Sequence, residues 1–266
     1  AETGGPGQAA SAAAPFRMCT AILLRRPGHP WPLLLAANRD ERLDRAWDPP
    51  AAHWPDRPGL VAGRDRSGGG TWMGMERGLV AAVLNRPGSL GPAPGKRSRG
   101  DLPLIALAAG NAAAAAGTIQ ALDAGAWRPF NMVLADAREA FFLRGLGAGR
   151  AEAVPLPPGI TMVTAHEPND LGSPRIARHL PRFRAAPPPD PDAAETGWAG
   201  WEALLADGGF GAEGIAGALN VPPVEGFGTV CSSLVALGAE GARIWRFIGG
   251  PPRQGGYAAV ALPSGR

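Results

Sequence analysis

Short apolar runs separated by turn residues recur along this chain, and they predict β-strands. Most of the runs are too short for a helix and are bounded by glycine, proline or charged residues. Two pairs of runs are joined by polar connections of turn length, at 136–139 and 238–241, which indicates antiparallel hairpins. The predicted strands are residues 20–24, 32–37, 71–74, 79–84, 131–134, 140–143, 160–164, 230–237, 242–248 and 257–262.

Helical patterns are fewer and stand in blocks between groups of strands. Asp101 precedes the longest pattern as a predicted N-cap, and Pro103 lies in its first turn. Blocks of strands and helices favour the α+β class over a strict alternation of strand and helix. The predicted helices are residues 102–116, 174–180, 198–206 and 212–219.

The composition is that of a globular protein. The chain has 266 residues, of which 45% are apolar, and this is ample for a sizeable core. Its longest apolar runs are far shorter than the roughly 20 residues that span a bilayer, so no membrane span is expected. Residues 1–17 are mainly Ala, Gly and Pro without an apolar signal-peptide core. We expect residues 1–17 to be a disordered extension and residues 18–266 to form a single domain.

Charge and cysteine usage narrow the class of partner. The net charge is +3 and Lys96 is the single lysine, so the basic character reflects arginine usage, and nucleic-acid binding is not expected. Two cysteines far apart in the chain indicate free thiols in a reducing compartment, with the cytoplasm as the expected location. The histidines are scattered, and no His-x-x-x-His or Cys-x-x-Cys spacing predicts a metal site.

Candidate chemistry begins at Cys19, which opens the first predicted strand. Loss of Met18 would give Cys19 a free α-amine with a reference pKa of about 7.7–8.0, able to take the proton of the thiol. One residue would then supply nucleophile and base. A buried core cysteine is the simpler alternative, because Cys is among the most buried residue types.

Polar residues also follow two other predicted strands. Asn38, Arg39 and Asp40 come directly after the second strand, where they fit either a polar network at the mouth of a site or a charged turn. Asn85 ends the strand at 79–84, where its side chain fits either an oxyanion donor or a turn before Pro87. Spacing alone does not separate these alternatives.

Six short motifs occur in order along the chain. They are Met-Cys-Thr at 18–20, Leu-Leu-Leu-Ala-Ala-Asn-Arg-Asp-Glu at 33–41, Gly-Gly-Thr-Trp-Met-Gly at 69–74, Ala-Val-Leu-Asn at 82–85, Ser-Arg-Gly-Asp at 98–101 and Phe-Asn-Met-Val at 130–133. Together they resemble the NRDE family, which includes the transport and Golgi organisation 2 proteins. The resemblance is specific through the last motif and looser to about residue 262.

The NRDE family is similar to the N-terminal-nucleophile hydrolases. The resemblance therefore implies a four-layer αββα sandwich, in which two antiparallel sheets pack face to face between helical layers. By analogy with bile-salt-hydrolase-like amidases, it implies Cys19 as nucleophile, Asp40 as the acid that orients its amine, and Asn85 as an oxyanion donor. The residues expected at the substrate site are Asn38, Arg39, Trp72 and Val230, with Cys231 on the opposite face of its strand.

Four positions depart from the relatives. Ala37 stands where the amidases have an arginine, and Val230 stands where NRDE relatives usually show one. Thr164 and Ala165 replace an expected Ser-Asn pair. These departures leave the implied catalytic set incomplete.

Two hypotheses for function follow, with an interaction module as a third. The first is a cysteine amidohydrolase that acts on linear amide bonds of a small amide or acyl substrate and requires no cofactor. The alternative is a non-catalytic carrier of haem, acyl-coenzyme A or a related lipid-like ligand, although no Cys-Pro or Cys-x-x-Cys-His haem signature is present. Both predict a small-molecule partner.

Overall fold

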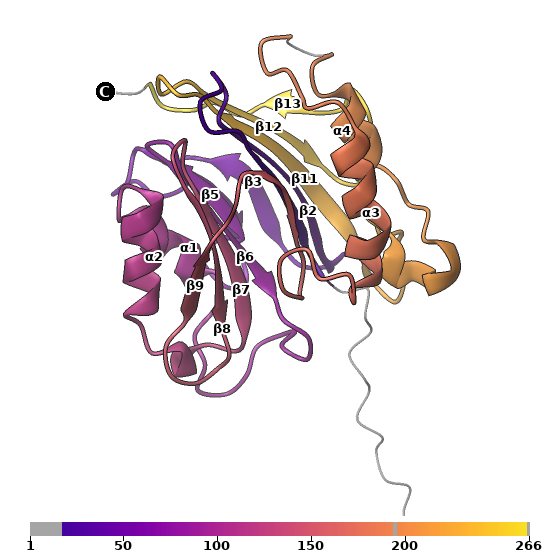
Figure 1. The fold of residues 1–266 in the computed structure, drawn as a ribbon. Coiled ribbons are helices and arrows are strands. Elements are labelled where there is room, and N and C mark those ends of the chain that lie inside the picture. The colour runs from indigo at the N-terminus through magenta and orange to yellow at the C-terminus, as the bar shows by residue number, and fades with distance from the viewer. Residues whose placement is uncertain (1–17, 194–195, 265–266) are drawn as a thin grey trace, which may run out of the picture.

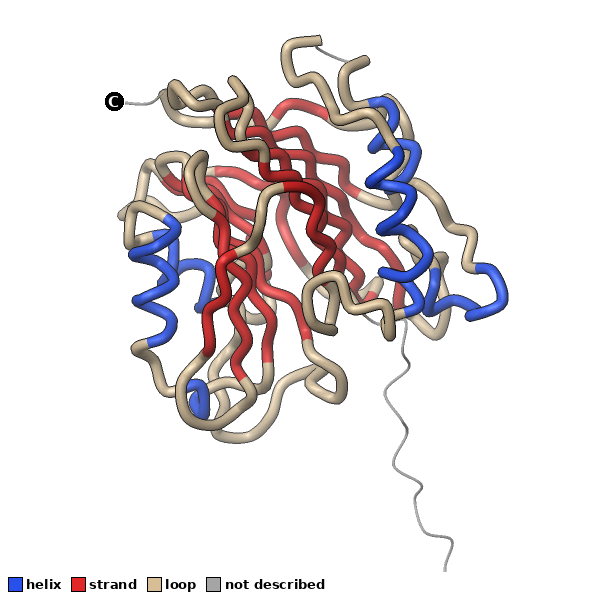
Figure 2. Tube along the Cα trace, in the orientation of Figure 1, coloured by secondary structure: helices blue, strands red, loops and turns tan. Residues whose placement is uncertain are grey.

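Two antiparallel sheets lie face to face at the centre of the structure, with helices on both outer sides (Figure 1). The computed structural model describes residues 18–193 and 196–264, so the predicted disorder of residues 1–17 lies outside the described residues. Figure 2 shows the strands of both sheets enclosed between the two groups of helices. The predicted α+β fold with an αββα arrangement is confirmed.

The first sheet has six strands and the second has seven. In spatial order, the six-stranded sheet holds β10 (Gly159–Val163), β1 (Thr20–Arg25), β2 (Leu33–Arg42), β11 (Phe227–Leu237), β12 (Arg243–Gly249) and β13 (Ala258–Ala259). The seven-stranded sheet holds β3 (Trp47–Ala51), β4 (Leu60–Asp65), β5 (Met73–Glu76), β6 (Leu79–Asn85), β7 (Phe130–Ala135), β8 (Ala140–Gly145) and β9 (Glu152–Pro155).

Strand β2 has apolar residues on both faces because it is covered on both sides. Leu33 and Leu35 belong to the core between the sheets, whereas Leu34 and Ala36 pack in the core beneath the outer helices. Successive strand side chains point to opposite faces, so a strand between two cores needs an unbroken apolar run. This explains why residues 33–37 show no polar alternation.

Each sheet has its own helical cover. The seven-stranded sheet is covered by α1 (Asp101–Leu107) and α2 (Ala112–Gln120), and the six-stranded sheet by α3 (Pro174–Ala185) and α4 (Ala199–Leu205). Two 3₁₀ segments complete the elements, η1 (Ala124–Ala126) and η2 (Gly211–Gly217). Within the described ranges, none of these helices is long and apolar enough to cross a membrane.

The helix predicted at 102–116 is two helices. Gly110 takes a φ of +88°, which ends the first helix, and the Asn111 side chain then accepts a hydrogen bond from the backbone N–H of Ala114 at 2.8 Å. Asp101 lies in the first turn of α1 and Gly100 is the N-cap, so the predicted cap is wrong by one residue. The helix predicted at 212–219 is the 3₁₀ segment η2.

Three strands were not predicted from the sequence, namely β3, β4 and β9, whereas β5 overlaps the strand expected at 71–74. Strand β3 contains Pro49 and Pro50, which disfavour a strand inside a sheet, but it is an edge strand, where proline is tolerated. Strand β2 is longer than predicted, because its pairing with β11 continues to Arg42 opposite Phe227. Asn38, Arg39 and Asp40 therefore lie inside the strand, and the alternative of a charged turn is wrong.

Strand β11 contains a β-bulge that changes which side chains face the core. Thr229 pairs with Asp40 and Cys231 pairs with Arg39, so Val230 is the extra residue between two matched pairs. The carbonyl of Val230 instead accepts a hydrogen bond from the N–H of Gly250 at 2.8 Å. Simple alternation along the strand is interrupted at this point.

The contact between Gly145 and Phe130 gives a stability prediction. These residues pair across β7 and β8, and a Cβ on Gly145 would lie 2.2 Å from Cε1 of the buried Phe130 ring. Gly145→Ala should lower the free energy of unfolding by about 1–3 kcal/mol in urea titrations, because the Phe130 ring must move.

Gly117→Ala is the matched control. Gly117 lies in α2 with nothing within 4 Å of its Cβ position, so this change should stabilise by about 0.5–1 kcal/mol. Equal effects of the two changes would contradict the assigned contact.

Candidate functional site

A small cavity lies between the two sheets at the N-terminal end of β1. Residues 19–21, 37–39 and 231–233 line it from the six-stranded sheet, and residues 72–73 and 82–84 line it from the seven-stranded sheet. We call it the intersheet cavity. It leaves about 20 Å³ for the centre of a water-sized molecule, which is room for roughly one water.

Cys19 brings its thiol to this cavity from the residue just before β1. The thiol donates a weak hydrogen bond to the backbone carbonyl of Asp40, with Sγ and O 3.6 Å apart. Burial raises the pKa of the Cys19 thiol to about 11, and the nearby charge of Asp40 adds to the increase. With residue 18 still attached, the thiol is therefore protonated at neutral pH and needs a base before it can act as a nucleophile.

The Asp40 carboxylate lies on the opposite face of β2, toward α3. Its Oδ2 is 2.9 Å from Nη1 of Arg175, and its Oδ1 accepts a hydrogen bond from Thr229 Oγ1 at 2.6 Å. Burial raises the pKa of Asp40 to about 6, while the charge of Arg175 and the hydrogen bond from Thr229 act in the lowering direction. The carboxylate is thus held on both oxygens.

Arg175 links this carboxylate to the peptide bond before Cys19. Its fully buried guanidinium also donates through Nη1 to the carbonyl of Met18 and to Thr20 Oγ1, the latter at 3.0 Å. Arg175 is not among the site residues expected from the sequence. A signal was present, because Arg175, His179 and Phe183 lie four residues apart and all fall on the buried face of α3.

Arg39 and Trp72 meet within the intersheet cavity, one from each sheet. The guanidinium carbon of Arg39 lies 4.1 Å from the centroid of the Trp72 ring. Arg39 is 6% exposed, and its Nη2 is 3.3 Å from Oε2 of Glu41. Its Nη1 is buried and has no hydrogen-bond partner among the described residues.

Asn38 supports the site through its side chain. Its Nδ2 donates to the carbonyls of Leu205 and Leu219, both at 3.0 Å, on the helical side of the sheet. The amide therefore ties β2 to the layer of α4, while the residue as a whole still borders the intersheet cavity.

The structure does not bring the Asn85 side chain to the intersheet cavity. Leu84 belongs to the core between the sheets, and Val83 to the core under α1 and α2. Alternation along β6 then directs Asn85 to the side of Val83, away from Cys19. The expected convergence of Asn85 with Cys19 is therefore wrong. The register of β6 decides which face the Asn85 side chain takes, and the sequence alone did not give this register.

The expected face of Cys231 is wrong, because Cys231 borders the intersheet cavity. Val230 is absent from the cavity lining, and it packs with Cys231 and Phe247 in a small cluster that Trp72 also contacts. The bulge is the cause, because the extra residue places Cys231 opposite Arg39. Position 230 is a valine, so it offers no guanidinium. The guanidinium that contacts Asp40 belongs to Arg175 in α3.

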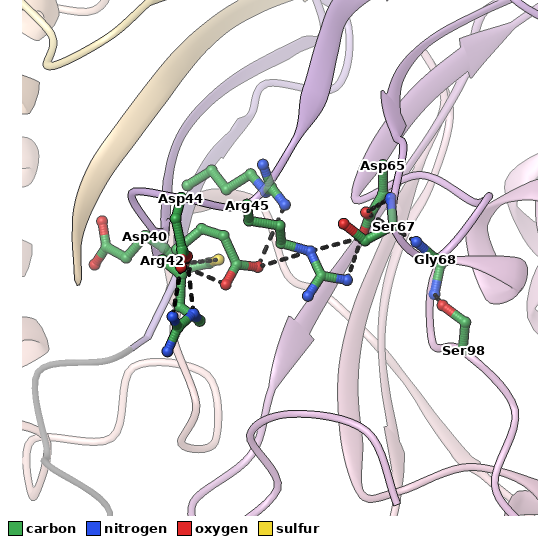
Figure 3. A network of polar contacts seen from close by, with 12 residues as sticks. Asp40, Arg42, Asp44, Arg45, Asp65, Ser67, Gly68 and Ser98 are labelled. Atoms are coloured by element: carbon green, nitrogen blue, oxygen red, sulfur yellow. Dashed lines mark hydrogen bonds and ion pairs between the residues drawn. The ribbon is translucent and has the colours of Figure 1, made fainter. Parts of the chain in front are cut away.

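A chain of alternating charges connects β2 to the seven-stranded sheet (Figure 3). Oε2 of Glu41 lies 3.6 Å from Nε of Arg45, and Nη2 of Arg45 lies 2.6 Å from Oδ2 of Asp65 on β4. The Asp65 carboxylate also accepts the backbone N–H groups of Ser67 and Gly68, both at 3.0 Å. Within residues 18–193 and 196–264, no group of three or more His, Cys, Asp or Glu is arranged to hold a metal ion.

Comparisons with known proteins place this geometry in a fold and a family. The structure is similar to the Caenorhabditis elegans ortholog of N-acylethanolamine-hydrolyzing acid amidase, with a TM-score of 0.54 and 10% sequence identity over 81% of this chain and 92% of that chain. At this identity the likeness shows the fold alone, which is the αββα sandwich of two antiparallel sheets. A search of curated proteins finds no match. The family model of Transport and Golgi organisation 2 matches residues 18–181, more than half of the sequence, and the chain therefore belongs to the Transport and Golgi organisation 2 family.

Proposed function

We propose that this chain is a cysteine amidohydrolase that acts on a linear amide bond of a small amide or acyl substrate, once Cys19 is the first residue. One observation carries the proposal. The Arg175 guanidinium joins the Asp40 carboxylate to the carbonyl of Met18, directly beside a thiol that borders a cavity. The similar amidase from Caenorhabditis elegans is named for amide hydrolysis, which supports the same bond class.

The free α-amine of Cys19 would be the base. It takes the thiol proton, and the thiolate then attacks the carbonyl carbon of the substrate. The protonated amine returns that proton to the leaving nitrogen as the carbon–nitrogen bond breaks, which leaves an acyl group on sulfur. Water activated by the same amine then hydrolyses the thioester.

Asp40 and Arg175 would act on this amine from the helical side of β2. The carboxylate accepts from the amine and orients it, whereas the nearby guanidinium disfavours a second positive charge and keeps the amine basic but neutral. The proposal assigns no role to Asn85, because its side chain lies on the other face of β6.

The lining of the intersheet cavity gives the haem carrier little support, because none of the residues that border it is a histidine. The structure therefore favours the hydrolase, and the carrier stays an outcome of the test below.

Removing the residues before Cys19 should switch the site on. A chain expressed from Met18 and trimmed to Cys19, checked by intact mass, should be acylated by p-nitrophenyl acetate about 100-fold faster than chain 1–266, because the amine replaces an amide nitrogen that cannot accept a proton. Cys19→Ala should remove the gain while keeping an amine, and Cys231→Ala should leave it intact. Equal non-zero rates would show that the amine is not the base, and equal silence would favour the carrier.

The protonation of Asp40 should appear in the stability of chain 1–266. The folded-state pKa of about 6 lies above the unfolded value of about 3.9, so the folded chain binds this proton more tightly. The contribution of Asp40 to the free energy of unfolding is fully present below about pH 4 and should fall by about 2–3 kcal/mol as the pH rises through 6. Urea titrations of the parent and Asp40→Asn from pH 4 to 7.5 measure it, because other groups cancel in the difference. An advantage of the parent that grows with pH would mean that Arg175 outweighs burial.

A further inference from the structure

The buried Nη1 of Arg39 is the feature that the proposed mechanism does not use. Arg39 borders the same cavity as Cys19, and its Nη1 has no acceptor among the described residues. A buried polar group without a partner is costly, and buried charged groups are normally paired. An acceptor that enters the cavity would satisfy it.

The rest of the guanidinium is fixed, so the free nitrogen has a defined direction. The Trp72 ring lies against its plane, and Nη2 contacts Glu41. Oε2 of Glu41 is shared, because it also lies 3.6 Å from Nε of Arg45. A single carboxylate oxygen thus serves two arginines, and Arg39 is only partly neutralised.

Arg99 adds a further positive charge at this site. Its Nη1 donates to the carbonyls of Ser89 and Pro129 and to Ser89 Oγ, which are all uncharged acceptors. The charge of Glu41 acts on the Arg99 guanidinium, whose pKa burial lowers to about 10. Arg99 therefore adds positive charge near Glu41, the carboxylate that Arg39 contacts.

We propose that Arg39 binds a carboxylate of the substrate through Nη1, so that the substrate class is a small amide or acyl compound with a carboxylate close to its reactive carbonyl. This inference rests on the proposed function for the role of Cys19. A carboxylate forms short, charge-assisted hydrogen bonds with a guanidinium and fits its planar edge. The cavity is partly open, so the substrate can extend out of it, and the positions of Cys19 and Arg39 on its border set a short spacing between the two groups.

Calorimetric titration of chain 1–266 with two isosteric probes tests the proposal without any turnover. Glutaramate carries a carboxylate where glutaramide carries a neutral amide, and it should bind about tenfold more tightly or better. Arg39→Gln should reduce this ratio to about twofold. Arg42→Gln is the matched control, because Arg42 is on the same strand, is 64% exposed and pairs with Asp44 outside the cavity. It should keep the parent ratio.

Several results would overturn the inference. These are equal binding of the two probes, failure of both to bind, a ratio that survives Arg39→Gln, and a ratio lost equally in Arg42→Gln. Where Arg39→Gln does not fold by circular dichroism, Arg39→Lys replaces it and should give an intermediate ratio, because the charge stays and the planar fork is lost; an unchanged ratio would contradict the proposal.

Kinetics on the trimmed chain separate this inference from the proposed function. Charge-dependent binding without amide hydrolysis would leave the Arg39 assignment in place and reject the hydrolase. Hydrolysis in which Arg39→Gln lowers kcat equally for both probes, with KM unchanged, would make Arg39 an oxyanion donor and reject the carboxylate anchor.

Discussion

The buried contact between Asp40 and Arg175 is the interaction on which the rest of the site depends. Both side chains are fully buried, and a buried ion pair stabilises little by itself because each charge loses its hydration. Removing one partner costs far more, about 3–5 kcal/mol, since the other charge remains unpaired. The main role of the Asp40–Arg175 pair is therefore to position neighbouring segments rather than to stabilise the fold. It fixes α3 against β2 and holds the chain on either side of Cys19.

The site uses the two faces of one strand for two tasks. Arg39 faces the intersheet cavity with Cys231 opposite, whereas Asp40 faces the helical layer with Thr229 opposite. The side chains proposed to bind the substrate therefore lie on one face of β2, and those proposed to orient Cys19 lie on the other face. Trp72 completes the binding side from the other sheet, which couples the cavity to the packing of both sheets.

Much of this fold could be predicted from local pattern, and the failures have physical causes. Strands such as β1 and β6 are continuous apolar runs, whereas β3 contains prolines that only its edge position allows. The site was less predictable. Cys19 and Arg39 both border the cavity. The position of the Asn85 side chain depends on strand register, and that of Cys231 depends on a bulge that simple alternation does not contain. Arg175 is distant from Asp40 in the sequence, and their contact depends on how α3 packs against β2.

The opposite charges of Arg39 and Asp40 on consecutive positions also constrain how β2 can pair. A shift of one residue would exchange the faces of the strand, which moves the Asp40 carboxylate to the intersheet face and the Arg39 guanidinium to the helical face. The apolar part of β2 tolerates such a slip, because Leu33 to Ala36 are buried on both faces and either face accepts a similar side chain. The charged end of the strand thus carries the information that selects one alignment during folding. The polar end of β2 thus helps to set the register of the sheet and also forms part of the site.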